Sequence, residues 1–394
     1  MKKDTIEVQV KTITPIHIGS GNELKGNFEY LHFQNEGVVG VIDPLKIFEI
    51  IGEENLNTWV TAVEKQENLL KHLPQLRNVS SRDISSRILN IYDQAPDSDR
   101  NAIKEQIHLG LGKPTLPGSS LKGSIRTAIL TKLIKDNPSF VQKEENLGLA
   151  KRGRLVKYHA GQVEANYLTM GRPDSSKFGD LRQNPNKDLL RFLRVGDAYF
   201  DQSTTIVKNK VVNLFRDKWG EKREESSFYE CIPSNAIAHT VLQVPEKQIK
   251  EYQDKQRVRL EHASLLNPNR LFKLLNKHTL ELLNGEIAFW EDEDNPIAIG
   301  DYLEHLNQIR ELAKDANEQE CVIRVGAASG WEFMTGGWLN GKDVMGDFIL
   351  SDRSWTSLKR GLRKKNYPDD LLFPKTRKMI AEGVPFGFVK LSIG

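Results

Sequence analysis

The chain has 394 residues and a net charge of only +3, because Lys and Arg are nearly balanced by Asp and Glu. This length can bury a core in two domains or in one much-elaborated domain. The two cysteines, Cys231 and Cys321, lie far apart, which excludes a disulfide framework and a Cys-rich zinc site and favours a reducing compartment. The start lacks an apolar leader and no run could span a membrane, so we expect a cytoplasmic protein without a membrane partner.

Strands and helices are expected along the chain without regular alternation. Alternating apolar residues predict a strand over 6–13, the sequence Gly19-Ser-Gly21 predicts a flexible turn, and Asp43-Pro44 is typical of a helix start. Residues 55–112 and 146–188 have the composition of insertions, the second rich in loop residues. Further strands are expected over 37–42, 191–197, 204–215, 228–233, 236–244, 321–325 and 386–392. Residues 246–284 should be largely helical with a break near Asn267-Pro268, and another helix is expected over 299–315. This order favours the α+β class with antiparallel sheets.

The most informative segment runs from residue 115 to residue 130. A Pro-Gly turn and the hydroxyl residues Ser119 and Ser120 lead into a helix, where Lys122 and Arg126 should share the exposed face. Free N–H groups and the helix dipole favour an anion at such an N-terminus, so the segment predicts a phosphate-bearing partner. Neither a P-loop nor a dinucleotide fingerprint is present. The alternative is an ordinary helix with solvated cations. The positions expected on its buried face are Leu121, Ile125, Ala128, Ile129 and Leu133.

Basic residues also gather elsewhere in the chain. Lys151, Arg152 and Arg154 lie within one short run, and residues 353–365 carry another, whereas 291–294 is acidic. Local basic patches on a nearly neutral chain favour a defined groove for a polyanion. No His or carboxylate cluster has the spacing of a metal site, so we expect neither a metal nor a cofactor.

Four segments resemble one protein family. Thr14-Pro-Ile-His-Ile-Gly-Ser-Gly21 and Leu116-Pro-Gly-Ser-Ser-Leu-Lys-Gly-Ser-Ile-Arg-Thr-Ala128 are similar to the paired signatures of the RAMP superfamily of CRISPR-associated RNA-binding proteins. Arg191-Phe-Leu-Arg-Val-Gly-Asp197 and the late loop Arg324-Val-Gly-Ala-Ala-Ser-Gly-Trp-Glu-Phe333 resemble the branch that caps the crRNA 3′ end in type III-A (Csm) effector complexes. The late loop has fewer glycines than is usual in RAMP proteins.

The resemblance implies an α+β fold with a ferredoxin-like (RRM-like) RAMP core, helical insertions and a second, divergent RRM-like or helical module. We expect the RRM-like domain at residues 1–245, with its insertions at about 55–112 and 146–188. The divergent C-terminal module would then occupy residues 246–394 and carry a Gly loop near 326–330.

The resemblance also implies a function and a set of contacts. The chain would be a non-catalytic subunit that binds single-stranded crRNA, beside neighbouring RAMP backbone and small subunits and the nucleases that trim the crRNA. Lysine and arginine would hold phosphates, glycines would let the backbone approach the RNA, and an aromatic residue would stack on a base. The expected RNA-binding residues are His17, Gly19, Ser20, Gly21, Gly118, Ser119, Ser120, Lys122, Arg126, Lys151, Arg152, Arg154, Arg194, Arg324 and Trp331.

Two other functions stay open. A metal-independent RAMP endoribonuclease that processes crRNA would use His17 as the general base on a 2′-hydroxyl. A phosphometabolite-binding enzyme would instead use residues 115–130 as a small anion site. Steep salt dependence of oligonucleotide binding would argue against the second, since small ligands release few counterions. We favour the binding subunit, with a role in crRNA maturation and antiviral defence.

Overall fold

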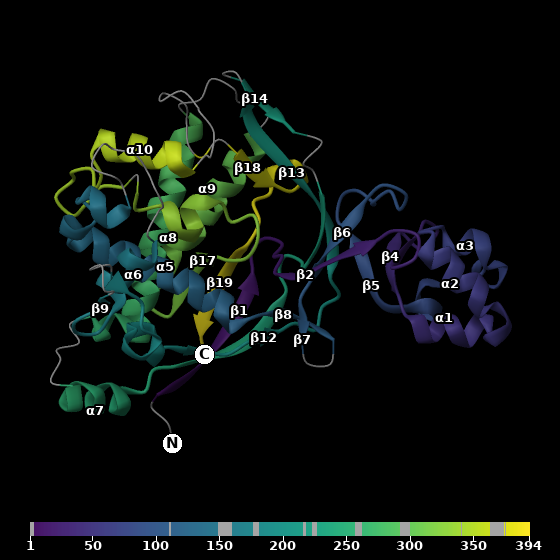
Figure 1. The fold of residues 1–394 in the computed structure, drawn as a ribbon, viewed down its shortest axis with the longest axis horizontal. Coiled ribbons are helices and arrows are strands. Elements are labelled where there is room, and N and C mark those ends of the chain that lie inside the picture. Colours follow the sequence, from purple (N-terminus) through teal and green to yellow (C-terminus); the bar gives the residue numbers. More distant parts are fainter. Residues whose placement is uncertain are drawn as a thin grey trace.

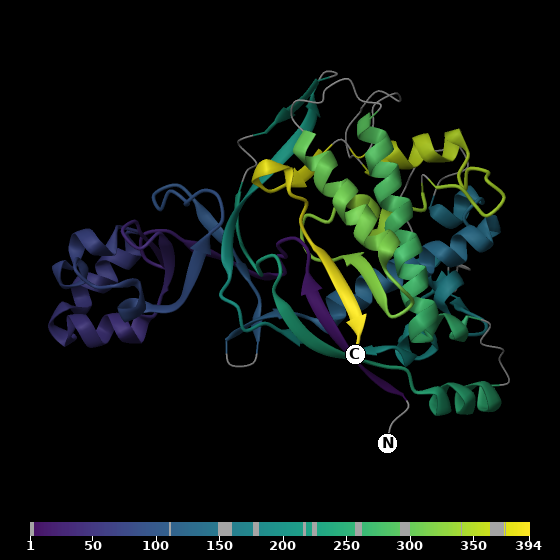
Figure 2. The same ribbon diagram turned by 180° about the vertical axis from the view of Figure 1, so that it is seen from behind.

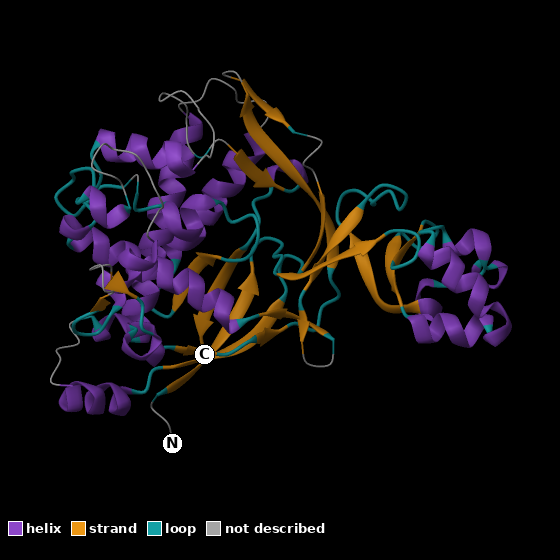
Figure 3. Ribbon diagram, in the orientation of Figure 1, coloured by secondary structure: helices purple, strands orange, loops and turns teal. Residues whose placement is uncertain are grey.

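The structure, a computed structural model, describes residues 4–109, 112–148, 160–175, 181–215, 218–222, 227–256, 262–291, 300–339, 341–362, 374 and 376–394. Long helices gather at one end of the molecule, and a smaller helical lobe projects from the other end (Figures 1 and 2). The strands lie between these two groups of helices (Figure 3).

The central sheet has five strands in the order β11-β16-β1-β19-β17, and each neighbouring pair is antiparallel. Alternation along β1 buries Val8, Val10 and Thr12, and a slip of one residue would move these side chains to the other face. The strands are β1 (Thr5–Thr12), β11 (Arg194–Val195), β16 (Ile237–Gln243), β17 (Glu320–Arg324) and β19 (Phe388–Ile393).

Two long helices, α5 (Gly118–Asp136) and α8 (Pro268–Glu291), pack on this sheet through one apolar cluster. The chain order β1-α5-β11-β16-α8-β19 is the β-α-β-β-α-β order of a ferredoxin-like unit, and its strands lie in the order β11-β16-β1-β19. The strand β17 extends the sheet beyond β19. The predicted α+β class is confirmed, and α5 buries every residue that its spacing placed on the apolar face.

The second sheet has nine strands, with the main order β2-β6-β15-β13-β5-β4-β3, while β14 and β18 also pair with β13. It is a mixed sheet, because β13 is antiparallel to β15 and parallel to β5. Its strands are β2 (Gly19–Lys25), β3 (Tyr30–Phe33), β4 (Val38–Ile42), β5 (Ser85–Ile91), β6 (Ala102–Gln106), β13 (Thr205–Phe215), β14 (Lys218–Glu221), β15 (Ser227–Cys231) and β18 (Thr376–Met379). Shorter strands are β7 (His108–Leu109), β8 (Lys113–Leu116), β9 (Asp174–Ser175), β10 (Leu181–Arg182) and β12 (Ala198–Tyr199).

The projecting lobe follows β4 and has an apolar cluster of its own. Its helices are α1 (Pro44–Ile51), α2 (Leu56–Glu64), α3 (Leu69–His72) and α4 (Ser81–Ile84). As predicted, Asp43 begins α1: its carboxylate accepts a hydrogen bond from the Leu45 N–H at 3.0 Å, and Pro44 occupies the first turn.

The remaining helices surround the core. They are α6 (Ala160–Leu168), α7 (Glu246–Gln256), α9 (Gly300–Asp315) and α10 (Asp352–Leu362). Short 3₁₀ turns occur at Glu53–Asn55, Pro74–Leu76, Pro138–Phe140, Glu144–Leu147, Pro185–Lys187, Leu189–Phe192, Ala263–Leu266 and Ala381–Gly383, and a π-helical turn at Glu332–Gly336.

Residues 13–18, which we call the crossover segment, carry the chain from the central sheet to the second sheet. The Ile13 N–H donates to the carbonyl of Phe388 at 2.8 Å, and the Pro15 carbonyl accepts from Gly387 at 3.0 Å. Ile16 exchanges hydrogen bonds of 3.0 and 2.8 Å with Ile232, on the connection from β15 to β16. The crossover segment and the connection from β15 to β16 are therefore joined to each other.

The structure differs from three sequence expectations. The predicted turn at Gly19–Gly21 is the start of β2, because this segment pairs with β6. Of the predicted strand at 191–197, the first two residues belong to a 3₁₀ turn that ends at Phe192, and only Arg194–Val195 joins the sheet. The insertion at 55–112 contains the strands β5 and β6 besides helices. The expected break near Asn267-Pro268 is confirmed, because α8 begins at Pro268 after a 3₁₀ turn, and the helix expected over 299–315 is confirmed. The domain division at residue 245 stays a prediction. The strands β17 and β19, which follow that position in the chain, share a sheet with β1, which precedes it.

Candidate nucleic-acid interface

His17 lies in the crossover segment and is only 3% exposed. Its Nδ1 is 2.7 Å from the carbonyl oxygen of Glu230, and its ring centroid is 4.6 Å from that of Tyr229. Because a carbonyl can only accept, Nδ1 carries the ring proton. Burial lowers the pKa of His17, although the Glu230 carbonyl opposes the shift, so the imidazole is neutral at pH 7.

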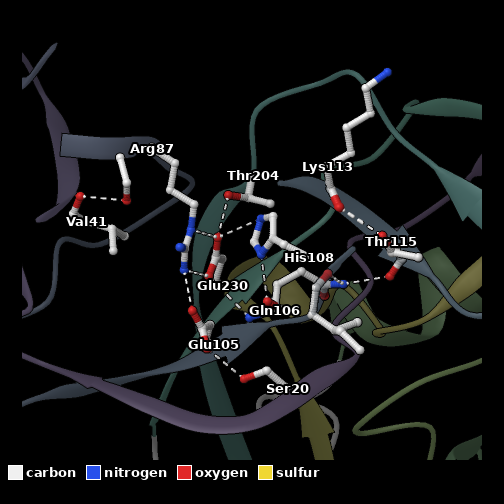
Figure 4. A network of polar contacts seen from close by, with 12 residues as sticks. Ser20, Val41, Arg87, Glu105, Gln106, His108, Lys113, Thr115, Thr204 and Glu230 are labelled. Atoms are coloured by element: carbon white, nitrogen blue, oxygen red, sulfur yellow. Dashed lines mark hydrogen bonds and ion pairs between the residues drawn. The ribbon is translucent and has the colours of Figure 1, made fainter. Parts of the chain in front are cut away.

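A buried carboxylate stands at the centre of the polar network in Figure 4. Glu230, on β15, is fully buried and accepts hydrogen bonds from Arg87 Nε at 3.0 Å and from Thr204 Oγ1 at 2.8 Å. Arg87 Nη2 also lies 2.8 Å from Glu105 Oε1, and Glu105 accepts from the Ser20 hydroxyl at 2.8 Å. This chain of contacts fastens the exposed start of β2 to the interior of the second sheet.

Gln106, also buried, ties the crossover segment to the strand that leads into α5. Its side-chain oxygen accepts from the Ile18 N–H at 2.8 Å, and its side-chain nitrogen donates to the Thr115 carbonyl at 2.9 Å. The same side chain therefore positions the segment of residues 14–21, which we call the early loop, and the approach to α5.

Gly118, the first residue of α5, occupies a tight space. A Cβ at this position would lie 2.1 Å from the carbonyl oxygen of Val195, so the close approach requires glycine. The Gly118 N–H donates to Asp197 Oδ1 at 2.7 Å, and a carboxylate of the chain itself thus already uses one donor of the helix N-terminus. Ser119 is exposed beside it, and Ser120 is half-buried.

The late loop packs directly on the crossover segment. Gly326 has φ of 81°, and a Cβ there would lie 2.6 Å from the His17 carbonyl oxygen. The same oxygen accepts from the Ala327 N–H at 2.9 Å. From α5, Ser124 donates to the carbonyl of Arg324 at 3.0 Å. The early loop, α5 and the late loop, which were separate sequence motifs, therefore meet at one place.

Arg324 does not face solvent, contrary to the charge contact expected of it. It is 6% exposed, and its guanidinium donates to the carbonyl oxygens of Phe386 at 2.8 Å and of Ala328 at 3.3 Å. The same group lies 4.9 Å from the ring centroids of both Phe333 and Phe388. These contacts assign Arg324 to holding the late loop in place.

Lys122 and Arg126 are half-buried rather than exposed. Arg126 lies 2.7 Å from Glu164 through Nε and 2.7 Å from Asp188 through Nη1, so two carboxylates already balance its charge. Partial burial lowers the pKa of Lys122, and the neighbouring Asp188 opposes that shift. Of the two cations, Lys122 is the one that no described carboxylate holds in an ion pair.

The other predicted contacts lie around this centre. Arg194 is exposed at the edge of the central sheet and contacts the side-chain oxygens of Gln243 and Gln248, each at 3.2 Å. Trp331 is half-buried, with its ring centroid 6.0 Å from that of Trp355. The predicted residues Lys151, Arg152 and Arg154 lie outside the described part of the chain.

The network of Arg87, Glu105, Gln106 and Glu230 was not predicted. Its members lie on β5, β6 and β15, and the contacting pairs are as much as 143 positions apart. No local spacing signals such a network. Within the described ranges, no group of three or more His, Cys, Asp or Glu residues could hold a metal ion. No helix in those ranges is long and apolar enough to cross a membrane.

The comparisons with known proteins extend over most of the chain. A family model described as the RAMP superfamily matches residues 9–331. The fold is similar to a chain in a cryo-EM structure of a Csm–crRNA–target RNA ternary complex of a type III-A CRISPR-Cas system, with a TM-score of 0.69, 22% identity, and 99% of this chain and 100% of that chain covered. It is also similar to crystalline T. onnurineus Csm5, with a TM-score of 0.63, 18% identity, and 97% and 99% covered. No curated protein matches this chain in sequence.

Substituting Gly118 tests the close approach at the start of α5. We expect Gly118→Ala to destabilise the protein by about 1–3 kcal/mol, because the new methyl would overlap the Val195 carbonyl. Gly123→Ala is the matched control in the same helix, where a Cβ meets no atom within 4 Å. It should stabilise the protein by about 0.5–1 kcal/mol through helix propensity. Urea unfolding measures both, and equal effects would contradict the tight contact.

Glu230, at the centre of the polar network, should contribute more to the stability of the protein than Glu105 at its rim. Glu230→Gln should lower the free energy of unfolding by about 1–3 kcal/mol, because a buried hydrogen-bonded charge facing Arg87 is lost. Glu105→Gln should cost less, since that side chain remains 18% exposed to water. Chemical denaturation of both variants would show the order, and the reverse order would contradict the central role of Glu230.

Proposed function

Because this chain belongs to the RAMP superfamily, we propose that it is a non-catalytic RNA-binding subunit of a type III-A CRISPR (Csm) complex. It caps the 3′ end of the crRNA and supports crRNA maturation and antiviral defence. Its partners are crRNA, the neighbouring RAMP backbone and small subunits, and trimming nucleases. The observation that carries the proposal is the end-to-end likeness in fold to a chain of a Csm–crRNA–target RNA complex.

The arrangement of the early and late loops supports RNA binding at this place. Gly19, Ser20 and Gly21 expose their backbone at the start of β2, the edge strand of the second sheet. The network around Glu230 holds this edge still, so little conformational entropy is lost when a ligand binds. Ser119 and Lys122 lie on the first turns of α5, and the Gln106 side chain links the approach to α5 with the early loop. We infer that Lys122 provides the phosphate contact, whereas Arg126 fastens α6 and Asp188 to α5.

The surroundings of His17 support a binding role over cleavage. A general base must reach the proton of a 2′-hydroxyl. The His17 ring is packed against Tyr229 with Nδ1 engaged, and Gly326 sits against its carbonyl. We therefore propose that His17 positions the two loops. The endoribonuclease that uses His17 as general base remains the alternative that the RNA experiment below tests.

The contact at Gly118 weighs against a phosphometabolite site. Asp197 accepts the Gly118 N–H at 2.7 Å, which places a negative charge where a small anion would bind. A long polyanion can instead pass along the exposed side of α5 and β2 without displacing Asp197. Both cysteines are buried and free, as expected for a cytoplasmic location in a reducing compartment, which we propose for this protein.

A salt series tests the phosphate contact at Lys122. We expect Lys122→Gln to weaken binding of single-stranded RNA and to reduce the slope of log K against log salt concentration by about 0.7, the value for one phosphate on a single strand. Lys247→Gln, at an exposed position of α7, is the charge-matched control and should leave both quantities unchanged. Fluorescence anisotropy with labelled RNA measures both. An unaltered slope for Lys122→Gln would remove this residue from the RNA interface.

The integrity of the bound RNA separates capping from cleavage. Labelled RNA should stay intact over hours with the wild-type protein and with His17→Asn, which can still donate to the Glu230 carbonyl. Circular dichroism confirms that the variant is folded, and denaturing gels follow the RNA. Cleavage by the wild-type protein that disappears in folded His17→Asn would establish the endoribonuclease instead.

A further inference from the structure

A pocket between α5 and α8 lies at the opposite end of α5 from the Gly118 turn. Its volume is about 300 Å³, at the small end of the range for ligand sites, which suits one anchoring side chain better than a cofactor. Both helices lie side by side at the end of the molecule away from the projecting lobe (Figures 1 and 2). The apolar lining residues are Ala128, Leu265, Leu274 and Val344.

One buried hydroxyl in this pocket lacks a partner. Thr131, on α5, is 3% exposed, and its Oγ1 has no hydrogen-bond partner among the described residues. A buried hydroxyl without a partner costs free energy, so Thr131 is less favourable for stability at this position than an apolar side chain of the same shape. His278 also lines the pocket, and burial lowers its pKa to about 4, so its ring adds no charge at pH 7.

Cations stand around the apolar pocket. Lys135 pairs with Glu281 at 2.6 Å, and Lys132 pairs with Asp136. Three further cations of α8 line the pocket, and no described carboxylate forms an ion pair with them. These are Arg270, Lys273 and Lys277, which are exposed and spaced by three and four residues along one side of the helix. The rim is therefore complementary to a negatively charged ligand.

Exposed apolar side chains continue from the pocket onto the surface. Val344 lines the pocket and is 65% exposed, and its N–H donates to the Lys135 carbonyl at 3.3 Å. Met345 and Phe348, on the same loop, are 82% and 61% exposed. Large apolar side chains exposed together beside a pocket are typical of a protein interaction surface.

We propose that this pocket docks an acidic segment of a partner protein, with one large apolar side chain inserted between α5 and α8. The carboxylates of that segment would pair with Arg270, Lys273 and Lys277. RNA fits less well, because apart from His278 no described lining residue offers a ring on which a base could stack. The inference rests on the proposed function, because the partner would be another protein of the same complex.

Photo-cross-linking in the assembled complex tests the occupant directly. In one variant the photoreactive residue p-benzoylphenylalanine replaces Lys273 at the rim of the pocket. In the control variant it replaces Lys247 on α7. After irradiation, mass spectrometry should identify an acidic segment with a large apolar residue in another protein, cross-linked from Lys273 only. Cross-links to RNA at Lys273, or to no protein at all, would overturn the proposal. Failure of the complex to form would count against the proposed function, and the RNA affinity of the free chain tests that function separately.

Two sets of variants measure the contribution of the rim and of the hydroxyl. Lys273→Glu/Lys277→Glu should reduce retention of the partner at least tenfold, about 1.4 kcal/mol, whereas Lys247→Glu/Lys255→Glu on α7 should not. RNA affinity should change equally in both pairs. Thr131→Val should raise the melting temperature of the free chain, because the unpartnered buried hydroxyl is removed, and should leave partner retention unchanged. Equal retention of the partner by all variants would contradict the pocket as a docking site.

Discussion

A buried backbone segment outside regular secondary structure must find hydrogen-bond partners one by one, and residues 13–18 are such a segment. Their partners come from β19, from the connection between β15 and β16, from the late loop and from the Gln106 side chain. The relative position of the two sheets therefore depends on this segment. It also places the late loop, because Gly326 and Ala327 contact the His17 carbonyl directly. His17 is central to this junction through its structural role.

Buried charges support the same junction. Glu230 is matched by Arg87, and the Arg324 guanidinium is held by carbonyl oxygens and two aromatic rings. A buried charge that loses its partners is strongly destabilising, so each of these groups enforces one arrangement of the strands around it. The exposed start of β2 is anchored through Ser20 and Glu105 to this interior. The exposed, glycine-rich start of β2 is therefore held in position by buried charged groups.

Helix α5 links the two surfaces that we assign. Its first turns face the early loop and carry Lys122, and its last turns line the pocket shared with α8. From Lys122 to Lys135 the helix rises roughly 20 Å, at about 1.5 Å per residue. In the proposed function, a single rigid element would hold RNA near one end and a protein partner near the other.

The sequence by itself determined the elements whose signals are local. The spacing from Leu121 to Leu133 specified the buried face of α5, Asp43-Pro44 specified the start of α1, and the motif pairs pointed to the RAMP family, because each depends on residues close in the chain. Only the tertiary structure decided what those residues do. It turned Arg324 inward, paired Arg126 with Glu164 and Asp188, and assembled the network around Glu230. These contacts join residues tens to hundreds of positions apart, and burial and pairing exist only once the chain has folded.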